Sequence, residues 1–245
     1  MTEFDATSKL RGARFRGVDL TGARLRNVTL ADVKIVDAEV DGLTINGIEV
    51  GPLIEQEIER RWPERSALRP DDPSEMRTLW GRLEDRWAVT VERARKLPEA
   101  CLRESVDDEW SFLQTLRHLT FATEAWIVRA VLGEDRPFHA TSLAWEGPWY
   151  DYVSEICGLD PTLDPSLDEI LAARSERQAV VRELLADITP EHLAQNCPPN
   201  SDVGYPMGTE LERCTVRDCI WTVFNEEWWH HVYATRDLEV LEQRP

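Results

Sequence analysis

A strict five-residue repeat near the N-terminus constrains the fold of this chain more than any other feature of its sequence. Large apolar residues recur at this spacing in nine consecutive units, and a second apolar column lies two positions before them. The first column is Leu10, Phe15, Leu20, Leu25, Leu30, Ile35, Val40, Ile45 and Val50. A period of five fits neither an α-helical turn nor the alternation of a strand. The segment is therefore expected to form a solenoid in which equivalent side chains stack from coil to coil.

The pattern resembles the pentapeptide-repeat family, whose units form the four sides of a right-handed quadrilateral β-helix. The resemblance implies that both apolar columns point inward. Nine units make only a little more than two coils, and the ends of a solenoid need a cover. The amphipathic segment from Leu53 to Trp62 is expected to be a helix that caps the open end. Basic residues dominate between Lys9 and Arg26, which favours a structural or docking role over mimicry of DNA.

Charge and cysteine content limit the partners of the chain. The 245 residues include 28 basic and 46 acidic ones, for a net charge of −18. Such a field repels phosphate backbones and anionic lipid surfaces, so we expect neither nucleic acid nor membrane as a partner. No stretch approaches the roughly 18 apolar residues that span a bilayer. Five cysteines without a CxxC pair, and no apolar signal peptide, predict reduced thiols in a cytoplasmic protein.

Apolar residues at helical spacing predict a four-helix bundle after a proline-rich linker. The predicted division is a repeat module with its capping helix over 1–62, a linker over 63–74 and the bundle over 75–245. The four helices begin near Met76, after Ser111, after Ser166 and after Thr215, and the last three begin with capping-box patterns. Two irregular connections, 134–165 and 190–213, are expected to wall a pocket. The predicted fold class is thus mainly α: a bundle preceded by a short β-helix.

The last predicted helix carries two carboxylate–imidazole pairs at i, i+4 spacing, Glu226/His230 and Glu227/His231. Glu227 and His231 share a face with apolar residues, whereas the other pair shares a largely polar face. A buried carboxylate is costly unless it meets a cation. We therefore predict a metal site formed by His118, Glu227 and His231, although His118 could instead be a hydrogen-bonded core histidine. Two histidines and one carboxylate leave an open coordination position and suit zinc, nickel or ferrous iron.

Two stretches resemble the DinB/YfiT superfamily of metal-binding four-helix bundles. They are EWSFLQTLRHLTFATEAW over 109–126 and NEEWWHHVYATRDL over 225–238. Most members have histidine where this chain has Glu227, and a glutamate there is similar to the mycothiol-dependent maleylpyruvate isomerase branch. The resemblance implies a zinc-dependent S-transferase or isomerase that activates a low-molecular-weight thiol such as mycothiol. Its partners would be that small-molecule thiol and an electrophilic substrate.

Two other functions stay open from the sequence. A metal-assisted hydrolase would need a general base, for which Glu226 is the obvious candidate. A non-catalytic metal-binding or scaffold protein would need no such group. Arg236 is a candidate for binding a carboxylate of thiol or substrate, with a surface ion pair as its alternative. Trp228 and Trp229 are expected to be packing or interface residues. An interface role would be compatible with a homodimer.

Overall fold

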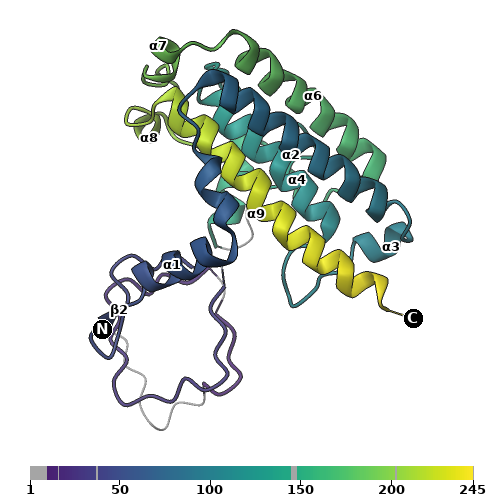
Figure 1. Ribbon diagram of the computed structural model, residues 1–245. Helices are drawn as coiled ribbons and strands as arrows, with labels where there is room; N and C mark the ends of the chain where they lie inside the picture. Colours follow the sequence, from purple (N-terminus) through teal and green to yellow (C-terminus); the bar gives the residue numbers. More distant parts are fainter. Residues whose placement is uncertain (1–9, 16, 37, 145–147, 202, 245) are drawn as a thin grey trace.

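Four long helices form the body of the molecule in the computed structural model, which describes residues 10–15, 17–36, 38–144, 148–201 and 203–244. They are α2 (Pro73–Ala94), α4 (Phe112–Thr123), α6 (Leu167–Asp187) and α9 (Val216–Glu242). Helices α2 and α4 each pack against both α6 and α9, which closes the four into a bundle (Figure 1). None of the helices in the described part of the chain is long and apolar enough to cross a lipid bilayer.

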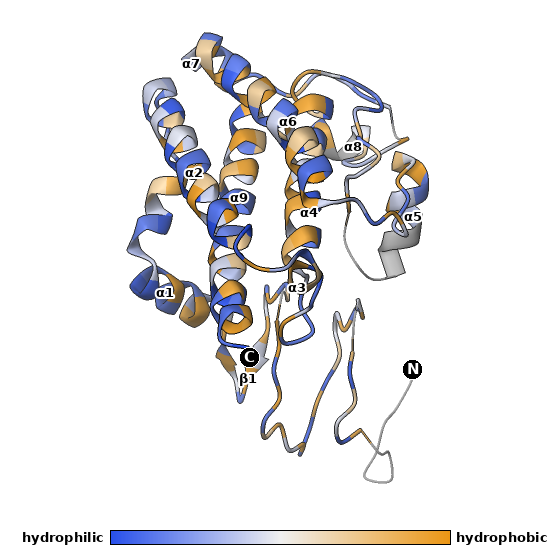
Figure 2. Cartoon of the chain, turned by 90° about the vertical axis from the view of Figure 1, so that its right-hand side faces the viewer, coloured by the Kyte–Doolittle hydropathy of each residue, from blue (hydrophilic) through white to orange (hydrophobic). Residues whose placement is uncertain are grey.

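The predicted helix starts are confirmed by their caps. The side chains of Ser111, Ser166 and Thr215 each accept the third backbone N–H of their helix in a complete capping box. Each box satisfies two amides that would otherwise lack a partner. Helix α2 begins instead at Asp72, whose side chain accepts the amides of Ser74 and Glu75. Inside the bundle, α4 is buried along nearly its whole length and is largely apolar (Figure 2).

Helix α4 does not continue as a regular α-helix to its end. It passes into a π-helical segment, η2 (Glu124–Arg129), before ending near Gly133, which has a positive φ of 77°. The sequence predicts a single regular helix ending at Gly133, so the predicted end is right and the π segment is missed. A π turn widens the helix, and such turns often occur at functional sites. Here it begins with Glu124, a carboxylate that is fully buried.

The connections contain more helix than predicted. Short helices lie between the long ones: α3 (Glu99–Leu102), α5 (Pro148–Cys157), α7 (Pro190–Leu193) and α8 (Gly208–Leu211). The predicted linker contains a 3₁₀ helix, η1 (Pro63–Leu68). It is ordered because Leu68 is buried in the bundle core and Trp62 packs edge-on against Trp228 and Trp229. Within the connection 134–165, which is predicted to wall a pocket, Trp145 and the side chains of Trp149 and Tyr150 lie outside the described residues.

The repeat segment winds as an open coil made of turns (Figure 1). Its described residues contain one strand pair, β1 (Thr44–Ile45) antiparallel to β2 (Ile48–Glu49), so the four-sided β-helix is not confirmed. Four of its turns are closed by a backbone hydrogen bond of 2.9 to 3.4 Å, in which an N–H group donates to the carbonyl of the residue three positions before it. The accepting residues are Leu10, Leu20, Leu30 and Val40. Residues in the left-handed region recur at multiples of five positions: Gly12, Gly17, Gly22, Asn27, Asp32, Gly42 and Gly47. Such turns suit glycine, asparagine and aspartate, a regularity that sequence reasoning overlooked.

The apolar column of the coil is not buried as expected. Its side chains from Phe15 to Ile35 are 49 to 66% exposed. The physical reason is length, because in little more than two coils most residues of the column would have a single stacked neighbour. Helix α1 (Gly51–Arg61) follows the coil directly, with the Leu53 and Ile54 amides donating to the Val50 carbonyl. Leu53 and Ile54 of α1 are themselves exposed. The helix that was expected to cap the coil therefore does not bury these apolar side chains against it.

Candidate metal centre

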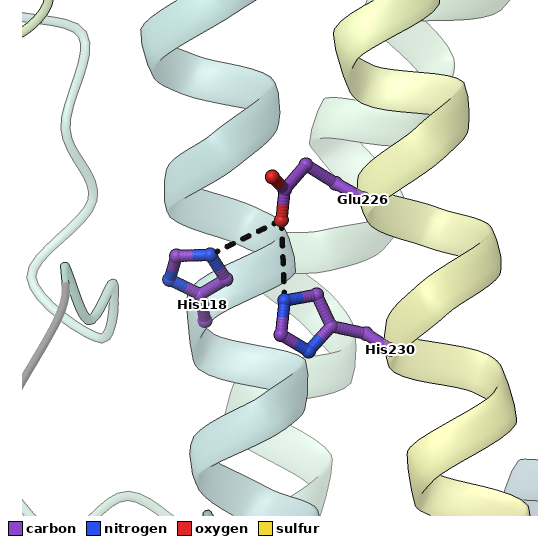
Figure 3. Close-up of side chains that lie close together, drawn as sticks. All are labelled: His118, Glu226 and His230. Atoms are coloured by element: carbon purple, nitrogen blue, oxygen red, sulfur yellow. Dashed lines mark hydrogen bonds and ion pairs between the residues drawn. The ribbon is translucent and has the colours of Figure 1, made fainter. Parts of the chain in front are cut away.

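Three ligand-type side chains meet between α4 and α9: His118, Glu226 and His230. The Glu226 Oε2 atom lies 3.4 Å from His118 Nε2 and 3.1 Å from His230 Nε2. Figure 3 shows the two imidazoles converging on the one carboxylate oxygen, His118 from α4 and the other two from α9. One ligand atom from each side chain falls within 4.8 Å of the others, the arrangement expected around a single ion. His118 is buried, and the α9 pair is half-buried.

The ring of His118 is held by the backbone. Its Nδ1 atom lies 3.0 Å from the carbonyl oxygen of Ala144 and 3.3 Å from that of Leu143. Carbonyl oxygens only accept hydrogen bonds, so Nδ1 carries the proton and donates it. Nε2 is therefore the ring nitrogen that faces Glu226 and His230, and it is the atom that a metal ion would take. A backbone partner at the distal nitrogen is typical of histidines that bind metals.

The segment that ends at Ala144 is fixed in turn by Glu124 at the start of the π-helical segment. The Glu124 carboxylate accepts hydrogen bonds from the Ser142 hydroxyl at 2.6 Å and from the His139 amide at 2.9 Å. Arg177 of α6 donates to the same carboxylate at 2.8 Å. Burial raises the pKa of Glu124, and these donors oppose the rise by favouring its charged form. The carboxylate thus connects α6, the π turn and the carbonyls that orient His118.

A tryptophan covers the site from the turn before α4. The Trp110 ring stacks nearly parallel to His230, with centroids 5.7 Å apart, and lies 4.5 Å from the His118 ring. Beside it, Glu109 forms an ion pair of 2.5 Å with Arg236. Arg236 also pairs with Asp237 at 2.7 Å, and these hydrogen bonds raise its pKa. Arg236 thus lies in ion pairs with two acidic residues, as in the surface alternative that the sequence left open.

Burial raises the pKa of Glu226, but hydrogen bonds from His118 and His230 outweigh it and hold the pKa below its usual range. The carboxylate is therefore charged across the neutral pH range. One anionic oxygen donor and two imidazole nitrogens form the donor set preferred by zinc and related divalent ions. The three residues fit such an ion by chemistry as well as by distance.

The structure does not bring the predicted pair Glu227 and His231 to His118. Glu227 is buried, as expected, but its cation is Arg174 of α6, at 2.5 Å. His231 lies on the side of α9 that faces α2, with its Nε2 atom 2.9 Å from the Thr90 hydroxyl and its ring edge-on to Trp87. The structure therefore uses this pair for packing between α9, α2 and α6.

The sequence prediction took burial as the mark of a ligand, whereas the structure brings the less buried pair to His118. The most buried stripe of α9 faces the α2–α6 side, whereas a metal that meets a substrate must lie near an opening. The half-polar face with Glu226 and His230 fits that requirement. A further signal was present in the predicted third helix, where Arg174 follows Ile170 by four positions within the apolar stripe. A charged residue in such a stripe calls for a buried acidic partner, and Glu227 supplies it.

Comparison with known proteins agrees with this architecture. The profile of the DinB superfamily matches residues 82–234, which include all three residues of the centre. Pentapeptide repeats match residues 8–42, in eight copies. Neither a curated protein nor a solved structure matches the chain. The match over most of the bundle shows that this chain belongs to the DinB superfamily and carries pentapeptide repeats at its N-terminus.

Proposed function

We propose that His118, Glu226 and His230 bind a divalent metal ion, zinc in the first instance, and that the protein uses it to activate a low-molecular-weight thiol. The observation that carries this proposal is the orientation of His118, whose Nδ1 is committed to backbone carbonyls while Nε2 faces the other two ligands. Membership in a superfamily that includes metal-dependent enzymes supports it. When bound, the metal would lower the pKa of a thiol sulfur and so favour the nucleophilic thiolate.

The side chains around the centre have distinct parts in this proposal. The Glu226 carboxylate reduces the net charge of the site, which leaves it suited to a single anionic sulfur. The backbone carbonyls hold the His118 ring at one angle, so little reorganisation is needed on binding. Trp110 covers one side of both imidazoles and limits the access of water. An electrophilic substrate would then approach from the side that Trp110 leaves open.

Thiol activation fits the site better than hydrolysis does. A metal-assisted hydrolase needs a base to take a proton from water, and Glu226 was the candidate for that task. In the structure Glu226 lies between the two imidazoles as a member of the ligand group itself. In the part of the chain that the structure describes, the group contains no further carboxylate. A thiolate acts as nucleophile directly and needs no such base once its proton is lost.

Metal analysis of the full chain, purified without a histidine tag, tests the centre. The wild type is expected to keep bound metal through dialysis against a weak chelator, and His118→Ala and His230→Ala are expected to lose it. His231→Ala is the matched control, because it removes the neighbouring imidazole that faces Thr90. Loss of metal in His231→Ala, with retention in His230→Ala, would contradict this centre and favour the pair predicted from the sequence.

A thiol panel tests the chemistry separately. The metal-loaded protein is incubated with an electrophile such as a maleylpyruvate-like diacid or a chlorinated aromatic, with mycothiol, bacillithiol, glutathione or no thiol. Turnover that requires one of the thiols, and that His118→Ala abolishes, supports the proposal. Turnover without any thiol would favour the hydrolase, and metal binding without turnover in any arm would favour a binding protein.

A further inference from the structure

Three of the five cysteines come together where the connection after α7 meets the start of α9. The backbone N–H of Cys197 donates to the carbonyl of Cys214 at 2.9 Å, next to an antiparallel bridge between Asn196 and Thr215. Across this bridge the sulfur of Cys197 lies 3.4 Å from that of Cys219, 22 residues on. Both side chains are buried, at 7% and 0% exposed. Their spacing in the sequence offers no reason to pair them.

We infer that Cys197 and Cys219 form a modification site, a dithiol that hydrogen peroxide oxidises reversibly to a disulfide. A disulfide has a sulfur–sulfur distance of about 2.05 Å, so the two sulfurs need to approach by about 1.3 Å. Rotation of two small side chains supplies much of such a shift. The bridge already fixes the backbone of Cys197 beside the first turn of α9, so no segment has to unfold.

The two thiols differ in a way that assigns their roles. The hydrogen bond with Cys219 lowers the pKa of the Cys197 thiol, while that bond and burial raise the pKa of Cys219. Cys197, also the more exposed of the two, is therefore the sulfur that reacts with peroxide. The Cys197 thiolate attacks one peroxide oxygen, the O–O bond breaks, and a sulfenic acid forms while the departing hydroxide takes a proton and leaves as the first water. The Cys219 sulfur then attacks the sulfenic sulfur, the S–S bond forms, and a second water leaves.

The bond would join the connection after α7 to the helix that carries Glu226 and His230. Cys219 lies about two turns before Glu226 on the same side of α9. The connection is held further along by Arg129, which donates to the carbonyls of Ser201 at 2.6 Å and Pro206 at 3.1 Å. Oxidation would therefore join the two ends of the segment 197–219 by a covalent bond. A raised thermal midpoint, by about 5 °C, is expected from a crosslink of this span.

Peptide mapping of the full-length protein tests the inference without any variant. Reduced protein is exposed to hydrogen peroxide while folded, its remaining thiols are alkylated under denaturing conditions, and trypsin is added without reductant. Trypsin cuts after Arg182, Arg213, Arg217 and Arg236, which places the three cysteines on separate peptides, 183–213, 214–217 and 218–236. The expected product is 183–213 joined to 218–236, with three alkylated cysteines elsewhere, and dithiothreitol should separate the two peptides.

Variants provide the matched controls. Cys214→Ala is expected to keep the crosslink and the raised midpoint, whereas Cys197→Ala and Cys219→Ala are expected to lose both. The inference is overturned if oxidised wild-type protein retains five alkylatable cysteines, if the dominant crosslink contains 214–217, or if oxidation stops at sulfinic acid on Cys197. The outcome does not depend on the metal centre, because mapping needs neither metal nor turnover.

Discussion

Leucine side chains are exposed to solvent in the coil and buried in the bundle. Leu25 of the coil is 62% exposed, and Leu116 of α4 is fully buried. The coil takes its shape from local turns with a residue of positive φ, and four of the described turns are closed by a backbone hydrogen bond. The bundle takes its shape from apolar burial and from charges matched across helices. The five-residue repeat of the coil thus specifies the path of the backbone, whereas the apolar stripes of the bundle specify which side chains are buried and so provide stability.

The largest expected effect concerns ion pairs, because Arg174–Glu227 is buried in the bundle whereas the pair between Arg14 of the coil and Asp108 is exposed. Arg174→Ala leaves the Glu227 carboxylate buried without its cation. It should lower the free energy of unfolding by about 3–5 kcal/mol. Urea denaturation measures this loss, and Arg174→Met combined with Glu227→Leu should recover much of it. A cost below about 1 kcal/mol for Arg174→Ala would mean that water reaches the pair.

Leucine truncation compares the two regions directly. Leu116→Ala should cost about 2–5 kcal/mol, because it leaves a cavity among α4, α2 and α9. Leu25→Ala should change the free energy of unfolding by less than about 0.5 kcal/mol, since its side chain is already in water. Both are measured by the same urea titration. A cost above about 2 kcal/mol for Leu25→Ala would show a buried, stacked column and would restore the β-helix.

Glycine substitution should have opposite signs in the two regions. Gly22 has a φ of +73°, so Gly22→Ala strains its turn by about 1 kcal/mol and should speed limited proteolysis within the coil. Gly81 lies in α2 with open space where an alanine methyl group would project, so Gly81→Ala should stabilise the bundle by about 0.5–1 kcal/mol. Equal proteolysis of Gly22→Ala and wild type would argue that the turns do not define the coil.

The smallest effect is expected where the two regions meet. Arg14 pairs with Asp108 at 2.9 Å, and Lys34 lies 3.9 Å from Asp107, both in exposed positions. Arg14→Ala should change stability by no more than about 1 kcal/mol, and added salt should remove the difference from wild type. Thermal unfolding at low and high sodium chloride measures it. A salt-resistant loss would reveal a contact between coil and bundle beyond this pair.

The sequence was sufficient for the elements of the bundle but not for which glutamate of α9 faces His118. Its capping boxes and apolar stripes predicted where α4, α6 and α9 begin, because both signals act within one helix. Which helix a face meets depends on packing between helices, and that decided between Glu226 and Glu227. The apolar column of the coil was predicted to point inward and is exposed, for a related reason. The repeat spacing shows that the units have the same local structure, but it does not show how much of each unit is buried by its neighbours.

Adjacent Glu–His pairs give α9 two nearly equivalent faces, offset by one residue. Turning the helix by about 100° would exchange Glu226 with Glu227 and His230 with His231. Apolar packing favours the observed rotation, because Ile220, Val223 and Phe224 are buried on the side of Glu227. Arg174 reinforces this choice by supplying the cation for the one glutamate that the rotation buries. The buried ion pair and the apolar stripe thus fix the same helix orientation, in which Glu226 is left to face His118.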